Sequence, residues 1–334
     1  MKDSFGREID YLRISITDRC NLRCRYCMPQ GVDVKKAHSE ILSFEEIAEI
    51  AEAAIGLGVR KIRLTGGEPL VRRGMPELCG MLSALPGLEE LCVTTNGTLL
   101  SAACPFPSAN AAIGHQSGIG GVTLAAALKD AGVTRLNISL DTLDPEKYTK
   151  ITGGGRLEDV LLGLEAADAA GFTGTKINAV LIGGFNDSEI RDLAGLSTHR
   201  NIEVRFIELM PVGAAAGLGA GAFISSDEVL KALPELEELE PARLYRLPGA
   251  KGRVGIISPI SCSFCGSCNR LRLTADGYIK PCLHSDREIK VRGLHSAELE
   301  EALRQAILSK PKEHGRLTPG HMTETKRSMN RIGG

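Results

Sequence analysis

Two groups of cysteines, one near each end of the 334-residue chain, are the residues best suited to chemistry. The first group contains Cys20, Cys24 and Cys27, and the second contains Cys262, Cys265, Cys268 and Cys282. The remaining cysteines are scattered and comprise Cys79, Cys92 and Cys104. In a chain without a secretion signal, clustered cysteines indicate metal ligands or redox centres, whereas a disulfide framework is typical of small secreted proteins.

The first group has the spacing C-x3-C-x2-C and directly follows a strand-like run. Three thiolates on a four-iron cluster leave one iron without a protein ligand, and that iron can bind and reduce a small molecule. A structural zinc site is closed by four ligands, so zinc would need a further ligand such as His38. The spacing therefore favours a 4Fe-4S cluster with one open iron, with zinc as the alternative.

The second group contains the spacing C-x2-C-x13-C, formed by Cys265, Cys268 and Cys282, and again offers three ligands. Arg270 and Arg272 follow in an extended run, where alternate residues point to one face. Guanidinium groups match phosphate oxygens bidentately, so two on one face beside a metal suit a polyphosphate. The alternative is a solvated strand face with surface ion pairs.

Six strand-like runs alternate with helical patterns through the first two-thirds of the chain. We expect strands at Tyr11–Thr17, Arg60–Thr65, Leu91–Thr95, Arg135–Leu140, Thr175–Ile182 and Glu203–Leu209. A helix at Phe44–Ile55 opens with a Ser43/Glu46 capping box, and another at Leu157–Ala170 ends before Gly171. Repeated strand–helix units predict an α/β fold: a partial (β/α)6 barrel of the TIM type, with its chemistry at the carboxyl ends of the strands.

We predict three regions along the chain. Residues 1–225 form the barrel core, with a Pro- and Gly-rich insertion loop at 102–123; residues 226–320 form a smaller α+β region that carries the second cluster. Residues 321–334, which end in Gly333-Gly334, show no helical or strand period and are expected to be a flexible tail.

The charge pattern excludes a global footprint for nucleic acid or an anionic membrane. Lys and Arg number 40 against 41 Asp and Glu, so the net charge is -1 and phosphate binding must be local. No run approaches the roughly 20 apolar residues that a membrane-spanning helix requires. We therefore expect a cytoplasmic enzyme, either a monomer or a homodimer. Its hydrophobic content of 43% is sufficient for a large buried core.

The segment from Cys20 to Cys27, with Tyr26 before the last cysteine, resembles the signature of the radical SAM superfamily. Gly66-Gly67-Glu68-Pro69 is similar to the GGEP motif of that family. The resemblance implies S-adenosylmethionine (SAM) on the open iron and its reductive cleavage to a 5'-deoxyadenosyl radical. It also implies SAM contacts from Tyr26, Gly67, Ser139 and Met210. Without the resemblance, Ser139 is a strand-end hydroxyl and Met210 a core residue.

Cys265-x2-Cys268-Asn269-Arg270-Leu271-Arg272 with the later Cys282 is similar to one subfamily, the GTP 3',8-cyclases (MoaA), through nearly the whole chain. The resemblance implies a lyase with a second 4Fe-4S cluster, whose free iron holds the guanine of GTP. The product would be (8S)-3',8-cyclo-7,8-dihydroguanosine 5'-triphosphate, formed in the first step of molybdenum cofactor biosynthesis. Cyclic pyranopterin monophosphate synthase would take it further.

The same resemblance implies that basic side chains grip the triphosphate. The implied GTP contacts are Arg13, Arg63, Thr95, Lys176, Arg270 and Arg272, with Lys61 and Arg205 as additional basic contacts. For the hydroxyl contact, Thr94 is the alternative to Thr95. Gly333-Gly334 resembles the paired terminal glycines of the family, whose backbone fits a site too narrow for side chains; the alternative is a frayed tail.

Two features depart from the family pattern. Cys262 lies three residues before Cys265, so Cys262 and Cys265 could replace Cys265 and Cys268 as ligands; Asn269-Arg270 after Cys268 favours the later pair. The loop at 102–123 is longer than the connection usual there, and is either a surface excursion or damaging to the fold.

Two other functions compete with GTP cyclisation. A radical SAM enzyme that modifies peptides or proteins would share the first cysteine group but should carry more cysteines toward its C-terminus. A non-enzymatic, metal-binding regulatory protein would have no use for the GGEP turn or for the basic residues on its strands.

Overall fold

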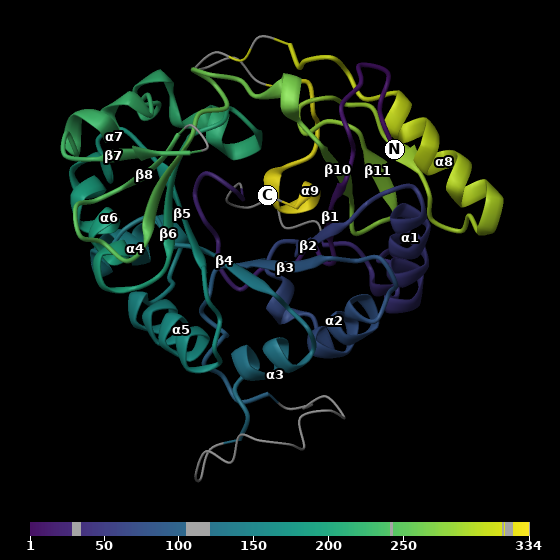
Figure 1. The fold of residues 1–334 in the computed structure, drawn as a ribbon, viewed down its shortest axis with the longest axis horizontal. Helices are drawn as coiled ribbons and strands as arrows, with labels where there is room; N and C mark the ends of the chain where they lie inside the picture. Colours follow the sequence, from purple (N-terminus) through teal and green to yellow (C-terminus); the bar gives the residue numbers. More distant parts are fainter. Residues whose placement is uncertain (29–34, 105–120, 241–242, 316, 318–322, 334) are drawn as a thin grey trace.

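A single curved sheet with helices on its outer side organises the chain, and the computed structural model describes residues 1–28, 35–104, 121–240, 243–315, 317 and 323–333 (Figure 1). Its twelve strands follow the order β12-β11-β10-β1-β2-β3-β4-β5-β6-β9-β8-β7. The strands are β1 Tyr11–Ser15, β2 Lys61–Thr65, β3 Glu90–Thr95, β4 Arg135–Ser139, β5 Lys176–Leu181, β6 Glu203–Glu208, β7 Glu237–Leu239, β8 Leu244–Arg246, β9 Arg253–Ile257, β10 Arg270–Leu273, β11 Tyr278–Lys280 and β12 Ile289–Lys290. The α-helices are α1 Phe44–Gly56, α2 Met75–Ser83, α3 Leu124–Asp130, α4 Pro145–Thr152, α5 Leu157–Ala169, α6 Ile190–His199, α7 Asp227–Ala232, α8 Ser296–Leu308 and α9 Met329–Ile332.

The six predicted strands are confirmed as β1 to β6, and they pair in parallel in chain order. Apolar residues alternate with polar ones along these strands, as in β6, where Val204 and Phe206 are buried and Arg205 is half-buried. Helices cover the outer side of the sheet; α1, for example, buries Ile47, Ile50 and Ala51, and its predicted capping box is present. The sheet order does not return from β7 to β12, so the predicted partial barrel is confirmed.

The C-terminal region extends both edges of this sheet. Strand β10 pairs in parallel with β1, and β9 pairs in parallel with β6. Antiparallel strands then complete each edge, β11 and β12 on one side and β8 and β7 on the other. The sheet is thus continuous across residue 225, and the boundary predicted there stays a prediction.

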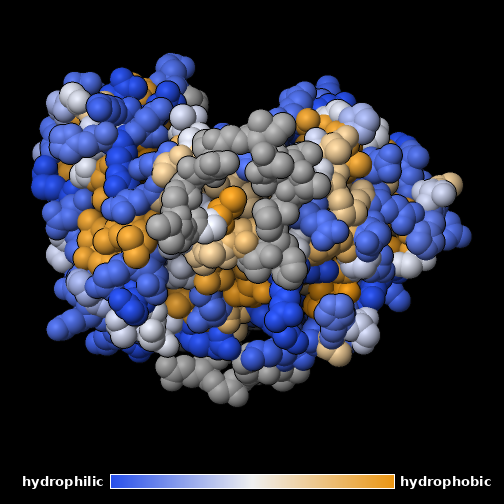
Figure 2. Space-filling view, turned by 90° about the horizontal axis from the view of Figure 1, so that it is seen from below, coloured by the Kyte–Doolittle hydropathy of each residue, from blue (hydrophilic) through white to orange (hydrophobic). Residues whose placement is uncertain are grey.

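One face of the outer surface is mostly hydrophilic where the described residues form it (Figure 2). Figure 2 shows charged and polar side chains over most of the face seen from below, with smaller hydrophobic patches among them. In the described residues, no helix is both long and apolar enough to cross a membrane.

Most of the predicted insertion, residues 105–120, lies outside the described residues, but its two ends are described and lie side by side. Ala103 forms a bridge with Thr123, and Leu124 N donates to Ala102 O at 2.8 Å. Strand β3 still pairs with β4 in register beside these ends. The connection therefore leaves the parallel sheet intact.

The end of the chain differs from the expected tail without helical period. Residues Met329–Ile332 form the short helix α9, in which Ile332 is 1% exposed and Asn330 is 7% exposed. Figure 1 shows α9 and the C-terminus in the middle of the curved sheet, whereas the N-terminus lies near α8 at the periphery. The four-residue length of α9 explains why no periodicity announces it in the sequence.

Helix α5 can approach the end of β3 only because residue 163 is glycine. A Cβ atom there would lie 2.1 Å from Gly97 O, whereas a Cβ at the exposed Gly195 in α6 would have no neighbour within 4 Å. We predict that Gly163→Ala lowers the free energy of unfolding by about 1–3 kcal/mol through overpacking. Gly195→Ala should raise it by about 0.5–1 kcal/mol, because alanine favours helix. Urea unfolding followed by circular dichroism measures both; equal effects would contradict the close-approach argument.

Candidate active site

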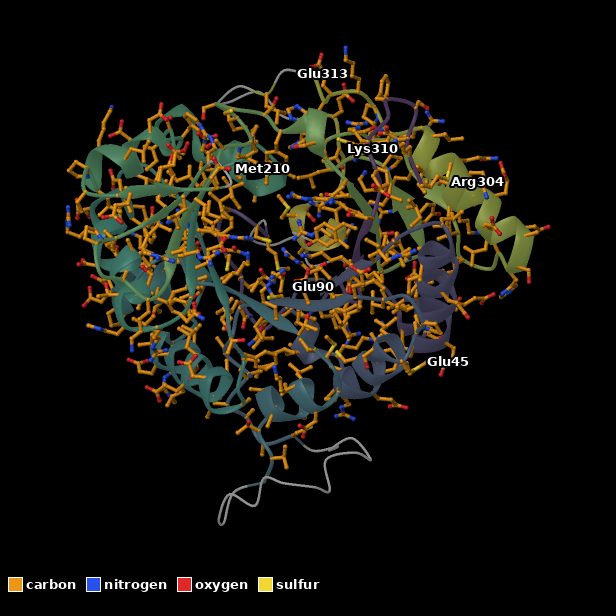
Figure 3. All side chains as sticks on the ribbon, in the orientation of Figure 1. Glu45, Glu90, Met210, Arg304, Lys310 and Glu313 are labelled. Carbon is orange, nitrogen blue, oxygen red and sulfur yellow. The ribbon has the colours of Figure 1, made fainter. Side chains whose placement is uncertain are left out.

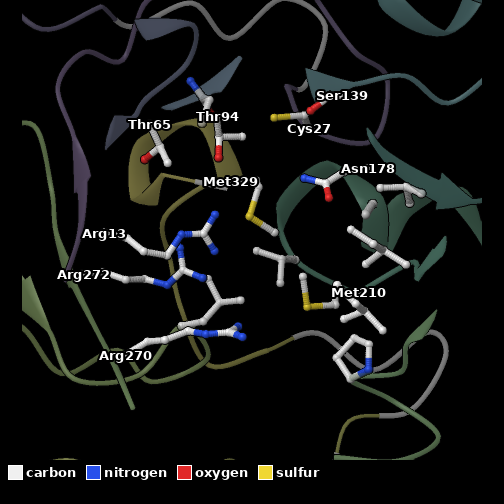
Figure 4. A pocket seen from close by; sticks show the side chains of 18 of the residues that line it. Arg13, Cys27, Thr65, Thr94, Ser139, Asn178, Met210, Arg270, Arg272 and Met329 are labelled. Carbon is white, nitrogen blue, oxygen red and sulfur yellow. The ribbon is translucent and has the colours of Figure 1, made fainter. Parts of the chain in front are cut away.

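A cavity of about 370 Å³ inside the curved sheet brings the two cysteine groups together. Its lining includes Cys20, Cys24 and Cys27 from the loop after β1, and Cys265, Cys268 and Cys282 from the C-terminal region. Figure 4 shows Arg13, Arg270 and Arg272 on one side of this cavity and Ser139, Asn178 and Met210 on the other. Residues separated by about 260 positions in the sequence therefore face one chamber, since β10 lies beside β1.

The loop that carries the first cysteines is held by backbone contacts on two sides. Arg23 N and Arg25 N donate to Thr152 O and Ile151 O at 2.7 and 2.9 Å. On the other side the GGEP turn approaches so closely that a Cβ at Gly67 would lie 2.3 Å from Arg19 O. A side chain at this glycine would displace the cysteine loop.

Burial makes the first three cysteines poor thiolates in the protein alone. It raises the pKa of Cys20 to about 11 and that of Cys27 to about 12, and the pKa of Cys24 also lies well above its usual range because of burial. A thiolate here requires positive charge, which the irons of a cluster would supply. The donor set and its buried setting thus fit an iron-sulfur cluster.

The predicted SAM contacts Tyr26, Gly67, Ser139 and Met210 all line the same cavity. Tyr26 lies directly against the first cysteine group, and its hydroxyl donates to Asp141 Oδ2 at 2.8 Å. Asp141 Oδ1 accepts a further hydrogen bond from Val180 N at 2.8 Å. This carboxylate therefore links the cysteine loop to β5, and the assignment of the four residues to SAM stays a prediction.

In the second cysteine group the structure separates Cys262 from the other three. Cys262 is exposed and does not line the cavity, whereas Cys265, Cys268 and Cys282 do. Burial raises the pKa of Cys268, but the positive charges of Lys310 and Arg270 and hydrogen bonds outweigh it, so the net pKa is lowered. The surroundings of Cys268 therefore favour a thiolate ligand.

Neither group is arranged around a single ion. Among the described residues, no three His, Cys, Asp or Glu side chains are close enough to hold one metal ion. His38, which the zinc alternative would need as a further ligand, lies on a short helical turn outside the cavity lining.

Three arginines form a row across the floor of the cavity. Arg13 on β1 is the register partner of both Arg63 on β2 and Arg272 on β10, so all three side chains share one face of the sheet. Burial and the charge of Arg272 hold the pKa of Arg13 well below its usual range. Burial and the charge of Arg270 lower the pKa of Arg272 to about 10. Such crowding of like charges is relieved by a polyanion.

The predicted lysines have a different setting. Lys61 pairs with Glu90 and Lys176 pairs with Glu203 at 2.9 Å, and neither lysine is among the residues that line the cavity. Burial lowers the pKa of Lys176 to about 8. Arg205 does line the cavity and shares Glu203 with Lys176. Contacts between these lysines and GTP stay a prediction.

The two threonines that the sequence left as alternatives both line the cavity but differ in their hydrogen bonds. Thr95 donates its hydroxyl proton to Glu68 Oε1 at 2.7 Å. In contrast, the buried Oγ1 atom of Thr94 has no hydrogen-bond partner. The same is true of Asn178 Oδ1, and both residues line the cavity. Sequence reasoning missed Asn178, although it lies two residues after the predicted contact Lys176 on the same strand, where alternate residues share a face. Buried polar atoms without partners indicate that a ligand supplies them.

The C-terminus reaches into the same region. Gly333 O accepts a hydrogen bond from Arg272 Nη1 at 2.6 Å. With φ at +69°, residue 333 adopts a left-handed conformation, and a Cβ there would lie 2.2 Å from Thr65 Oγ1. Glycine at 333 thus suits the narrow position that the sequence resemblance implied, while Gly334 lies outside the described residues.

Comparison with known proteins identifies two families along the chain. Residues 14–196 match the Radical SAM superfamily, and residues 202–316 match Molybdenum Cofactor Synthesis C. A GTP 3',8-cyclase of Alkaliphilus oremlandii is 47% identical over 342 residues, covering 100% of both chains. Another, from Peptoclostridium acidaminophilum, is 49% identical and covers 99% of this chain and 98% of its own.

Solved structures share the fold at low identity. Streptococcus suis SuiB bound to S-adenosylmethionine has a TM-score of 0.56 at 14% identity, with 89% of this chain and 68% of SuiB covered. Native anSMEcpe with bound AdoMet has a TM-score of 0.56 at 15% identity, with 90% and 81% covered. The full-length curated matches and both family models show that this chain belongs to the radical SAM superfamily and, within it, to the GTP 3',8-cyclase family.

Proposed function

We propose that this protein is a lyase that converts GTP to (8S)-3',8-cyclo-7,8-dihydroguanosine 5'-triphosphate. One observation carries the proposal: two cysteine triads line one cavity together with Arg13, Arg63, Arg270 and Arg272. The curated relatives, named GTP 3',8-cyclases, match this chain over its full length. The product would pass to cyclic pyranopterin monophosphate synthase in molybdenum cofactor biosynthesis.

The two cysteine triads in the cavity lining suit two 4Fe-4S clusters, one of which would bind SAM. Cys20, Cys24 and Cys27 would hold the cluster that binds SAM, and Cys265, Cys268 and Cys282 would hold the second one. When bound, these groups supply one-electron chemistry at the ribose of GTP and an iron site for guanine.

The protein's own residues bind and orient the nucleotide. The arginine row matches the triphosphate because each guanidinium offers parallel N–H donors to phosphate oxygens. Apolar side chains of the cavity lining, including Val180, Leu209 and Met210, exclude water from the reacting carbon atoms. Fixing GTP between the two cysteine triads brings its reacting carbon atoms into position.

The alternative of a peptide-modifying enzyme is supported only by fold. SuiB and anSMEcpe share less than a fifth of their residues with this chain, at 14% and 15% identity. A row of buried arginines suits a polyanion, which a general peptide substrate does not provide.

The decisive experiment is anaerobic incubation of the reconstituted protein with GTP, SAM and dithionite. We expect 5'-deoxyadenosine to form only when GTP is present, together with the cyclised nucleotide, as measured by chromatography and mass spectrometry. ATP at the same concentration is the control for a general effect of triphosphate. Formation of 5'-deoxyadenosine without GTP, or with peptide alone, would reject the proposal.

The exposure of Cys262 predicts which cysteines bind iron. Cys268→Ala should lower the iron content from about eight to about four per chain, because one of three ligands to the second cluster is lost. Cys262→Ala is the matched control and should keep the full content. Iron analysis after anaerobic reconstitution measures both, and a loss of iron in Cys262→Ala would show that Cys262 is a ligand.

The two threonines predict separable effects. Thr94→Val removes a hydroxyl that has no protein partner, so it should leave folding unchanged and weaken GTP binding by about 0.5–1.5 kcal/mol, about 2- to 12-fold in Kd. Thr95→Val removes the hydrogen bond to Glu68 and should lower the thermal midpoint instead. Calorimetric titration with GTP and a thermal melt compare the variants. Unchanged GTP affinity in Thr94→Val would assign the contact elsewhere.

A further inference from the structure

Lys310 is a buried lysine that the proposed reaction does not use. It follows α8, is 3% exposed and lines the cavity. Figure 3 shows Lys310 inside the ring of helices, whereas Arg304 and Glu313 lie at the periphery. A lysine so completely buried requires partners for its charge and its N–H groups.

Both hydrogen-bond partners of this ammonium lie beside cysteines of the second group. Lys310 Nζ donates to Arg270 O and to Pro281 O, both at 2.8 Å. Its positive charge lowers the pKa of Cys268. Arg270 lies two residues after Cys268, and Pro281 directly precedes Cys282. One side chain therefore joins the two chain segments that carry these cysteines.

We propose that Lys310 is a positioning residue for the second cluster, which holds the Cys268 and Cys282 segments at the correct separation and places a positive charge beside the cluster. This inference rests on the proposed presence of that cluster. An ammonium has three N–H donors, and the two carbonyl oxygens use two of them. Most of the hydrogen-bonding capacity of Lys310 is thus committed to the segments that carry the cysteines.

The third ligand segment is held by a different residue. Arg7 Nη1 donates to Cys265 O at 2.8 Å, and Arg7 is itself fixed by Asp3 at 2.6 Å. Substitution of Lys310 therefore releases the Cys268 and Cys282 segments while the Cys265 segment stays anchored.

Positive charge next to an iron-sulfur cluster stabilises its reduced form, and hydrogen bonds to the sulfur ligands act in the same direction. Loss of the Lys310 charge should therefore lower the midpoint potential of whatever second cluster still assembles. A residue with only a general role in folding would not change this potential.

The test isolates the second cluster in the full-length chain. Replacing Cys20, Cys24 and Cys27 by alanine removes the ligands of the first cluster and gives a parent protein with one cluster. Lys310→Met, Lys310→Arg and the matched control Lys312→Met, at an exposed lysine, are then compared in this parent after anaerobic reconstitution with iron and sulfide. Iron content, the EPR spectrum of the reduced protein, the midpoint potential and far-UV circular dichroism are measured.

We expect Lys310→Met to lose iron at least twofold, or to keep it with a lower midpoint potential and an altered EPR spectrum. Lys310→Arg keeps the charge and should retain most of the iron, and Lys312→Met should match the parent. If Lys310→Met does not fold, Lys310→Arg decides the question, and loss of its iron with normal circular dichroism overturns the proposal.

Two further outcomes also overturn it. The first is parent-like iron content, EPR spectrum and midpoint potential in Lys310→Met. The second is an intact cluster with weaker GTP binding when Lys310→Met is made in the otherwise unchanged chain, which would make Lys310 a substrate contact. Failure of the parent itself to bind iron is distinguishable, because it would remove the second cluster and the proposed function with it.

Discussion

Repulsion among buried guanidinium groups is the constraint on which the rest of the site depends. Arg63, Arg13 and Arg272 occupy neighbouring positions on three adjacent strands, and burial removes the water that would screen their charges. Burial, and after it the charge of Arg272, holds the pKa of Arg13 well below its usual range. A ligand with several negative charges relieves this repulsion, because each guanidinium then gains a charge-assisted hydrogen bond. The same interaction, between the guanidinium groups and phosphate oxygens, therefore both recognises a triphosphate and stabilises the occupied cavity.

The arginines lie together because the sheet pairs distant segments of the chain in register. Strand β10 arrives from the C-terminal region and pairs in parallel with β1, which directly precedes the first cysteine loop. This pairing sets Arg272 beside Arg13 and at the same time brings Cys268, which lies just before β10, into the chamber that holds Cys27. Fold and site are thus inseparable, since a slip of one residue between β1 and β10 would turn the arginine row to the opposite face.

The features that the sequence predicted are those with strong local signals. Alternation of strand and helix patterns located β1 to β6, and cysteine spacing located both triads, because ligand geometry restricts spacing. The edge strands are too short for such a signal; β12, for example, has two residues. The difference in hydrogen bonding between Thr94 and Thr95 depends on a third residue, Glu68, which the turn after β2 brings close to Thr95. No local pattern in the sequence encodes such a contact.

The penultimate glycine, Gly333, shows how the interior of the sheet limits which residues can fit inside it. Gly333 meets Thr65 on β2 on one side and Arg272 on β10 on the other, so the two strands that flank β1 limit the space for a side chain. Its carbonyl oxygen accepts from Arg272 with a partial negative charge, in the same sense as a phosphate oxygen but more weakly. The tail is therefore placed where it adjoins the arginine row without neutralising it. The backbone completes the wall of the cavity there, and the charge of Arg272 is left for a stronger anion.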